Sequence, residues 1–176
     1  EEVVLMTASL ARLLRQSISI ENELVTIGQE VEYVRSYLTI QKMRYKDKLE
    51  FEINVDPRIT HAQIIRLVLQ PIVENAIYHG LKYKESKGML KVHGYELGER
   101  IIIDITDDGV GMDEESLKHI YDKHKVNYHS NGVGVYNVQQ RLVLYYGKEY
   151  GIIYHSEKGK GTTATVVIPK KQEDVH

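Results

Sequence analysis

Residues 100–111 read RIIIDITDDGVG, and in them isoleucine recurs at every second position before two aspartates and two glycines. This period of two predicts a β-strand over Arg100–Asp107 with one buried face. The strand phase puts Asp107 on that face and Asp108 on the other. A carboxylate at the end of a buried face must find a hydrogen-bond donor, because an unpaired buried charge is costly. The same face carries Ile101, Ile103 and Ile105.

The turn that follows this strand, Asp107-Asp108-Gly109-Val110-Gly111, is rich in glycine. Gly109 and Gly111 would let the backbone pass close to a flat ring, since glycine has no Cβ. The exocyclic amine of adenine would then supply the donor that Asp107 requires. An ordinary Asp-Gly turn has the same letters, and turns of this kind are common.

Further strands and helices are predicted on both sides of this turn. Strands with one polar face, interspersed with helices, predict an α+β fold: a two-layer sandwich whose mixed or antiparallel sheet is covered on one face by helices. We expect a helical arm over 1–44, the main domain over 45–171 and a disordered tail over 172–176. The other strands are predicted over Leu49–Val55, Met89–Tyr95, Ile152–Ser156 and Thr162–Ile168. Helices are predicted over Val3–Leu14, Gln63–His79, Asp113–Tyr121 and Gly134–Tyr145, and one opens at Val25-Thr26 with Glu30 placed to assist its first turn.

The helix over Gln63–His79 is apolar over much of its circumference, yet it carries Asn75 and His79 on one face. A buried amide needs partners, and an amide oxygen is a suitable ligand for Mg²⁺. Bonds from Asn75 to nearby backbone, and a histidine that ends the helix before a capping Gly80, explain the same residues.

Two more glycine-rich stretches precede regular elements. Asn131–Asn137 (NGVGVYN) leads into a helix, where amide groups and the helix dipole favour a phosphate. This stretch is neither a dinucleotide fingerprint nor a P-loop, because no parallel crossover unit accompanies it and no Gly-Lys-Ser/Thr follows. Gly159–Thr163 opens the last strand, and the strand phase turns the Thr162 hydroxyl inward. A hairpin turn before a β-branched strand also explains this second stretch.

The length and composition set limits on the function. With 176 residues the chain can hold one full domain and a helical extension. A formal net charge of −2 gives no general attraction to nucleic acid or anionic lipid. The absence of cysteine excludes disulfides and a zinc ribbon, and it suits a reducing cytoplasm. No apolar run is long enough to span a bilayer, and a helical pattern already running at Glu1 indicates a segment cut from a longer chain.

The order of these motifs resembles the ATP-binding (Bergerat-type) fold shared by gyrase, histidine kinases, mismatch-repair ATPases and a heat-shock chaperone. The resemblance covers about residues 45–170. Within this superfamily, residues 69–80 (LQPIVENAIYHG) and 134–142 (GVYNVQQRL) are similar to sensor histidine kinases of the autolysin-regulator type. Leu13-Leu14-Arg15 and residues 37–45 (YLTIQKMRY) match that subfamily too, so the resemblance extends over nearly the whole chain.

The resemblance implies a role for each residue that matches a family motif. Asn75 would hold the Mg²⁺ that bridges the phosphates, and it forms the implied catalytic pair with His79. Asp107 would bond the adenine amine, and Thr162 would reach adenine directly or through water. A mobile lid would run from about Met112 to Asn131. The implied cofactor-binding residues are Asn75, Tyr78, His79, Lys82, Asp107, Gly109, Gly111, Met112, Gly132, Val133, Gly134, Val135 and Thr162.

Three departures from the family pattern refine these expectations. Relatives that hydrolyse ATP have a water-activating glutamate one helical turn before the asparagine, and here Pro71 stands there, which predicts poor attack by water. Pro71 is also expected to kink the helix by removing a bond to Leu67. Many kinases have lysine at the position of Tyr78, so the phosphate charge would fall to Mg²⁺, the helix dipole and Lys82. The family's acceptor histidine lies in a Pro-His-Phe motif, and none of the eight histidines here has that context.

The resemblance implies transfer of the γ-phosphoryl of ATP to a histidine that this segment lacks, and from there to a response regulator. The implied partners are that regulator and the protein's own dimerisation and phosphoacceptor helix, with a homodimer in the full-length protein and no nucleic acid. The implied location is the cytoplasm, as part of a membrane-anchored sensor. Two alternatives stay open: a non-catalytic nucleotide-binding regulator, and a serine kinase acting on anti-sigma antagonist proteins.

Overall fold

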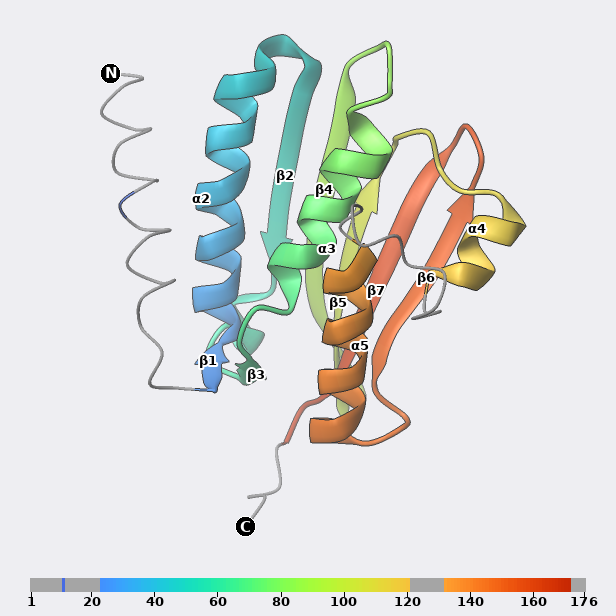
Figure 1. The fold of residues 1–176 in the computed structure, drawn as a ribbon. Coiled ribbons are helices and arrows are strands. Elements are labelled where there is room, and N and C mark those ends of the chain that lie inside the picture. Colours follow the sequence, from blue (N-terminus) through green and yellow to red (C-terminus); the bar gives the residue numbers. More distant parts are fainter. Residues whose placement is uncertain (1–10, 12–22, 121–131, 172–176) are drawn as a thin grey trace.

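A five-stranded β-sheet with helices on one face forms the described part of the chain (Figure 1). The computed structural model describes residues 23–120 and 132–171, together with Ala11. The rest of the predicted helix over Val3–Leu14 and the predicted tail lie outside these residues. The strands are β1 Leu24–Thr26, β2 Leu49–Val55, β3 Gln63–Ile65, β4 Gly88–Leu97, β5 Arg100–Asp107, β6 Gly151–Glu157 and β7 Gly161–Pro169. The helices are α2 Ile27–Tyr45, α3 Leu69–Asn75, the π-helix η3 Ala76–Leu81, α4 Glu114–His119 and α5 Gly132–Tyr146, with 3₁₀ turns η1 Lys46–Lys48 and η2 Pro57–Ile59.

The sheet has the order β2-β4-β5-β7-β6 and is mixed. β2 runs parallel to β4, and the other neighbouring strands are antiparallel. Helices α2, α3 and α5 lie side by side over one face (Figure 1). The β4–β5 hairpin turns near Gly98, whose φ of 59° suits glycine. This arrangement confirms the predicted α+β fold with a mixed sheet covered on one face.

The hydrophobic core lies between the sheet and these helices. Ile101, Ile103 and Ile105 of β5 are at most 1% exposed, as the period-two pattern predicts. Val34 and Leu38 of α2 are buried against the same core. Each fully buried aliphatic side chain stabilises the fold by roughly 1.5–3 kcal/mol, so this layer holds α2 on the sheet.

Helix α2 begins where the sequence predicts. Thr26 caps it by accepting a bond from the Gln29 amide at 3.1 Å, and the Gln29 side chain accepts from the Thr26 amide at 2.8 Å. Glu30 lies in the first turn, but its carboxylate points across to the start of α3. Neither α2 nor any other helix of the described ranges is long and apolar enough to cross a membrane. The division of the chain between residues 44 and 45 stays a prediction.

The helix predicted over Gln63–His79 was wrong at both ends. Gln63–Ile65 forms β3, which pairs antiparallel with β1 in a two-stranded ribbon. α3 begins only after Leu67, whose left-handed φ of 60° interrupts helical geometry. A short apolar run is ambiguous between a strand and a buried helix, and pairing with β1 decides for the strand. At the other end, the helix continues through Gly80 as the π-helix η3.

Pro71 therefore lies in the first turn of α3, which begins at Leu69. The predicted loss of a bond to Leu67 does not arise, because Leu67 precedes the helix. Amides in a first turn have no intrahelical partner, so proline is tolerated there without the predicted kink.

Candidate functional site

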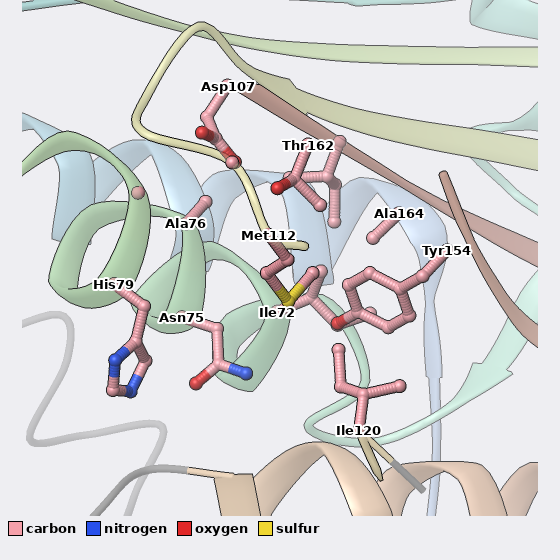
Figure 2. Close-up of a pocket in the computed structure, with 13 residues that line it drawn as sticks. Ile72, Asn75, Ala76, His79, Asp107, Met112, Ile120, Tyr154, Thr162 and Ala164 are labelled. Carbon is pink, nitrogen blue, oxygen red and sulfur yellow. The ribbon is translucent and has the colours of Figure 1, made fainter. Parts of the chain in front are cut away.

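A cavity of about 160 Å³ opens between the α3–η3 helix and the ends of β5 and β7. Figure 2 shows Asp107 and Thr162 at one end of it and Asn75 and His79 at the other. Six residues predicted from the sequence line it, namely Asn75, His79, Asp107, Gly111, Met112 and Thr162. The lining also includes side chains that were not predicted: Ile72, Ala76, Ile105, Ile120, Tyr154 and Ala164. The pocket thus has two polar ends joined by a mainly apolar wall.

Asp107 is the buried carboxylate at the first end. It ends β5 on the isoleucine face, as the strand phase predicts, and only 4% of it is exposed. Its Oδ1 accepts a hydrogen bond from the Gly109 amide at 2.9 Å. Burial raises the pKa of this carboxyl to about 6, even though amide bonds from Gly109 and Thr162 act in the other direction. The carboxylate therefore has fewer donors than its burial demands, and an amine of a ligand would supply one.

Three glycines let the backbone close around Asp107. A Cβ on Gly80 would overlap the Asp107 carboxylate, and a Cβ on Gly109 would overlap the backbone of Gly80. Gly161 has a φ of 115°, and a Cβ there would overlap the Asp107 carbonyl. Gly80 is therefore not the helix cap that was predicted. It lies inside η3 without the positive φ of a cap, and its missing side chain makes room for the carboxylate.

The turn after β5 is fastened to its neighbours by backbone bonds. The amide of Val110 donates to the Gly80 carbonyl at 3.1 Å, and the amide of Gly159 donates to the Val110 carbonyl at 2.7 Å. Gly111 has a φ of 63°, and a Cβ there would overlap the backbone of Glu157. These contacts hold the turn, and with it the end of β5, in a fixed position against the pocket.

Ser156 on β6 supports the pocket wall and was not predicted from the sequence. Its hydroxyl accepts from the Met112 amide at 2.8 Å and lies 2.8 Å from Oγ1 of Thr162. The alternation along β6 was the available signal, because it turns Ser156 to the inward face. Thr162 is the register partner of Asp107 across β5 and β7, so both side chains lie on one face of the sheet.

Asn75 at the second end carries a buried amide oxygen. Among residues 23–120 and 132–171, no hydrogen-bond partner of its Oδ1 is present. Leaving such an acceptor unsatisfied costs about 1–3 kcal/mol, so a bound ligand is the natural complement. The oxygen fits Mg²⁺, which binds few protein groups together with substrate phosphates. The described side chains form no cluster of three or more histidine, aspartate or glutamate ligands that would hold a metal by themselves.

His79 stands beside Asn75 at the mouth of the pocket (Figure 2). Its ring is partly open to solvent, and the part packed against the wall lowers its pKa below 6.5, with the charge of Lys82 acting in the same direction. The Nζ of Lys82 lies 4.2 Å from the ring centroid of Tyr78, a cation–π contact. Tyr78 is 45% exposed, and this pair lies outside the pocket lining.

The glycine-rich stretch predicted to meet phosphate lies at the start of α5. The helix begins at Gly132, earlier than predicted, and the side chain of Val133 lies outside the described part. Val135 is fully buried in the core. A Cβ added to Gly134 would lie 3.4 Å from Cβ of Pro71, so this glycine faces α3. Of the predicted lid, the first part is described and contains α4 Glu114–His119, whereas residues 121–131 lie outside the described part. The contact of the glycine-rich stretch with phosphate stays a prediction.

Solved structures with this fold include two histidine kinases. The catalytic domain of the histidine kinase ThkA superposes with a TM-score of 0.64 at 15% identity, covering 86% of this chain and 100% of that one. The blue-light activated histidine kinase of Erythrobacter litoralis EL346 gives a TM-score of 0.63 at 16% identity, covering 97% and 49%. At these identities the likeness shows the fold alone.

The sequence itself has closer relatives. The sensor histidine kinase YesM of Bacillus subtilis (strain 168) is 33% identical over 175 residues, which are 99% of this chain and 29% of that protein. The sensor protein LytS of Bacillus cereus is 30% identical over 148 residues, 84% of this chain and 25% of that protein. The sensor histidine kinase BtsS of Escherichia coli (strain K12) is 27% identical over 173 residues, 98% and 29%. The chain thus spans less than a third of the length of these relatives.

Two family models match separate parts of the chain. Residues 1–49 match the histidine kinase model. Residues 60–172, which include every residue of the pocket lining, match the model of the histidine kinase-, DNA gyrase B-, and HSP90-like ATPases. With its sheet, its buried Asp107 and its glycine turns in one matched region, the chain belongs to the family of histidine kinase-, DNA gyrase B-, and HSP90-like ATPases.

Proposed function

We propose that this domain binds ATP with Mg²⁺ and presents the γ-phosphoryl group to a histidine of its kinase. The observation that best supports this function is a pair of incompletely bonded polar groups in one pocket. They are the buried carboxylate of Asp107 and the buried amide oxygen of Asn75. A nucleotide with its metal offers both complements, an amine on the base and a cation on the phosphates.

At the base end, Asp107 accepts a hydrogen bond from the exocyclic amine of adenine. The apolar wall packs on the ring, as is typical of pockets that orient a ligand with few polar groups. Thr162 lies beside Asp107 on the same sheet face and reaches a second polar atom of the base. Guanine has a carbonyl oxygen in place of the amine, so an ionised Asp107 repels it.

At the phosphate end, Asn75 is the residue that would hold Mg²⁺. Bound there, the ion would neutralise charge on the phosphates. The lowered pKa keeps His79 neutral at pH 7, so its ring donates a hydrogen bond without a full charge. Lys82 supplies a positive charge that the Tyr78 ring holds beside this end of the pocket.

In the proposed transfer, the bond between the γ-phosphorus and its bridging oxygen breaks, a phosphorus–nitrogen bond forms, and ADP leaves. The attacking atom is the unprotonated nitrogen of a neutral imidazole, so no proton is removed before attack. The domain contributes positioning and charge neutralisation. Attack by water is disfavoured, because Pro71 has no titratable group and Glu74 is not among the described residues that line the pocket.

The proposal extends to the intact protein. The phosphoryl group passes from the histidine to a response regulator, and the intact kinase is a homodimer that joins through its phosphoacceptor helices. The domain works in the cytoplasm, as part of a membrane-anchored sensor. The relatives YesM, LytS and BtsS, which are sensor histidine kinases and a sensor protein, support this extension.

Calorimetric titration with ADP, with and without Mg²⁺, tests the proposed function. Wild type should bind one ADP per chain, and Mg²⁺ should tighten binding about tenfold or more. Asn75→Ala should keep weak binding and lose the effect of Mg²⁺, because the base end is untouched. Asn54→Ala is the matched control, since this asparagine is exposed on β2 and should respond as wild type does.

The outcomes separate the alternatives. A folded wild-type chain that binds no ADP would refute the nucleotide site. Binding without phosphoryl transfer to a histidine, in a longer protein that includes the phosphoacceptor helix, would favour the non-catalytic regulator. An equal effect of Mg²⁺ on Asn75→Ala and wild type would remove Asn75 from the metal site.

A further inference from the structure

Three consecutive backbone amides at the start of α3 converge on one carboxylate from another helix. Oε1 of Glu30 accepts from the Leu67 amide at 2.8 Å, and its Oε2 accepts from the amides of Val68 and Leu69 at 3.0 Å each. Glu30 is only 4% exposed. Its burial raises its pKa, and the three amide bonds act against that rise. The buried carboxylate of Glu30 is thus stabilised by amides at the start of α3 and not by groups of its own helix.

α3 depends on this contact because it has no cap of its own. Its N-cap residue is Val68, which makes no side-chain capping bond, and Pro71 in the first turn has no amide proton. Glu30 therefore replaces the local capping side chain, and its negative charge lies at the positive end of the helix dipole.

The segment before α3 carries backbone strain. Leu67 has a φ of 60°, a conformation that a branched residue adopts only where the surroundings impose it. One of those surroundings is Glu30, which holds the Leu67 amide. Another is α5, because Arg141 donates to the carbonyl of Arg66 at 2.8 Å. All three helices that cover the sheet thus meet at this junction.

The junction and the pocket lie on one continuous helix. Asn75 is six residues after Leu69, which is about 9 Å along an α-helix. A shift or rotation of the first turn is therefore carried to the Asn75 side chain with little loss. His79 follows on η3, which continues α3 without a break.

We propose that Glu30 is a positioning residue for the nucleotide pocket, and that it sets where Asn75 presents its amide oxygen by fixing the first turn of α3. The effect of Glu30 on binding of the magnesium nucleotide rests on the proposed function. Glu30 makes α2 the element that fixes the phosphate end of the pocket through the first turn of α3. A purely structural cap would differ, because it would affect stability and leave the geometry of the folded pocket unchanged.

The test compares Glu30→Gln with Glu32→Gln on the same helix. Glu32 is exposed and pairs with Arg35 at 3.3 Å, so its variant controls for loss of a charge on α2. Glu30→Asp keeps the charge but shortens the side chain, and it carries the test if Glu30→Gln does not fold. Two quantities are measured: the side-chain amide resonances of Asn75 in the ligand-free protein by NMR, and the ratio of ADP affinities with and without Mg²⁺.

We expect both Glu30 variants to shift the Asn75 resonances and to reduce the magnesium ratio about tenfold, while Glu32→Gln changes neither. The proposal is overturned if folded Glu30 variants only unfold at lower temperature, with resonances and magnesium ratio as in wild type. If wild type itself binds no ADP, the proposed function fails, and the resonances of the ligand-free protein still decide whether Glu30 positions Asn75.

Discussion

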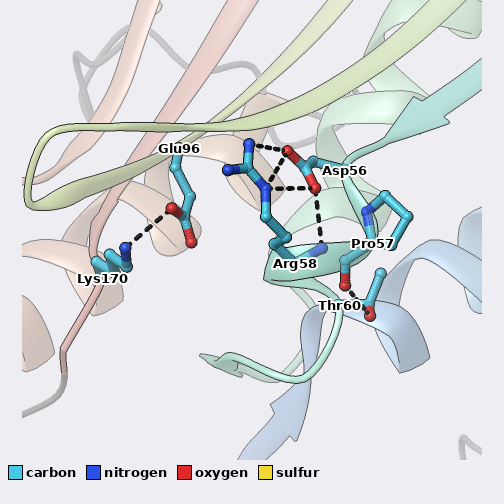
Figure 3. A network of polar contacts seen from close by, with 6 residues as sticks. All are labelled: Asp56, Pro57, Arg58, Thr60, Glu96 and Lys170. Carbon is cyan, nitrogen blue, oxygen red and sulfur yellow. Dashed lines mark hydrogen bonds and ion pairs between the residues drawn. The ribbon is translucent and has the colours of Figure 1, made fainter.

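Asp56 and Asp107 make the same backbone contact at the end of a strand, yet the pKa values of their carboxyl groups are shifted in opposite directions. One follows β2 and the other ends β5, and each accepts a bond at 2.9 Å from the amide two residues on, Arg58 or Gly109. The Arg58 side chain also folds back onto Asp56 (Figure 3), and its hydrogen bonds lower the pKa of that carboxyl to about 2. Burial instead raises the pKa of Asp107 to about 6.

The comparison shows which carboxylate is left with too few hydrogen-bond donors and can accept one from a ligand. On the surface around Asp56, charged groups are satisfied from within the chain, and the ion pair of Lys170 with Glu96 at 2.9 Å is a second example (Figure 3). Such exposed pairs add little to stability. In the pocket, the fold bears the cost of a buried carboxylate, and a ligand with an amine would repay it.

The substitution Asp107→Asn should break the comparison most strongly. The asparagine NH₂ group would face the adenine amine, so ADP affinity should fall roughly 10- to 100-fold or more. Because no charge is buried, the free energy of unfolding at pH 8 should rise by about 1–3 kcal/mol. Calorimetry and urea unfolding measure the two effects.

Asp56→Asn is the matched control for this variant. It should leave ADP affinity unchanged and should lower stability, because the carboxylate loses its arginine partner. Equal effects of the two substitutions on ADP binding would mean that Asp107 has no special part in the pocket.

Gly80→Ala should have the next largest effect. Alanine normally stabilises a helix by about 0.5–1 kcal/mol over glycine. Here the new Cβ would overlap the Asp107 carboxylate, so we expect a loss of roughly 1–3 kcal/mol and weaker ADP binding. Gly134→Ala in α5 is the control, because its new Cβ would have its nearest contact at 3.4 Å. This variant should be more stable than wild type in urea unfolding, as is normal for alanine in a helix. A more stable Gly80→Ala protein would contradict the close packing of η3 on Asp107.

The pH dependence of ADP affinity should show a smaller effect, which also depends on the ionisation of Asp107. Only the ionised form of Asp107 accepts the adenine amine, so ADP affinity should fall about tenfold per pH unit below about pH 6. Protonation of His79 would favour phosphate binding and act against this fall, so His79→Gln should show it more clearly. A flat affinity profile between pH 5 and about pH 7 in calorimetry would argue against an ionised Asp107 as the acceptor.

Stability should follow opposite trends at the two aspartates. The pKa of Asp107 in the folded protein lies above its ordinary value of 3.8, so its contribution is present below about pH 4 and is lost as the pH rises through about 6. The pKa of Asp56 lies below the same value, so its contribution is present above about pH 4 and is lost as the pH falls through about 2.

Much of the sheet could be predicted from the sequence. The alternation over Arg100–Asp107 gave the strand bounds and the inward direction of Asp107, because side chains in a strand point strictly to alternate faces. The segment Gln63–Ile65 could not be assigned in this way. Its apolar run fits a strand or a buried helix, and only its pairing with β1 distinguishes the two. The left-handed Leu67 has no local signal either, since leucine seldom adopts that conformation.

The candidate site was predicted less completely than the sheet. Asn75 and Asp107 could be found because a polar residue on an apolar face requires an explanation. The part played by Gly80 depends on the distance between η3 and β5, which no sequence period reports. The contact of Glu30 with α3 joins two helices through their ends, so it too appears only when the chain is folded.

The pairing of Asp107 with Thr162 across β5 and β7 has a consequence for specificity. The two residues proposed to face the base lie opposite one another on neighbouring strands, whereas Asn75 and His79 belong to the helical layer. In the proposed function, the sheet would therefore set the base preference and the helical layer would bind the phosphates. A library that varies only this cross-strand pair could retune the choice of nucleobase while leaving the phosphate-binding helix as it is.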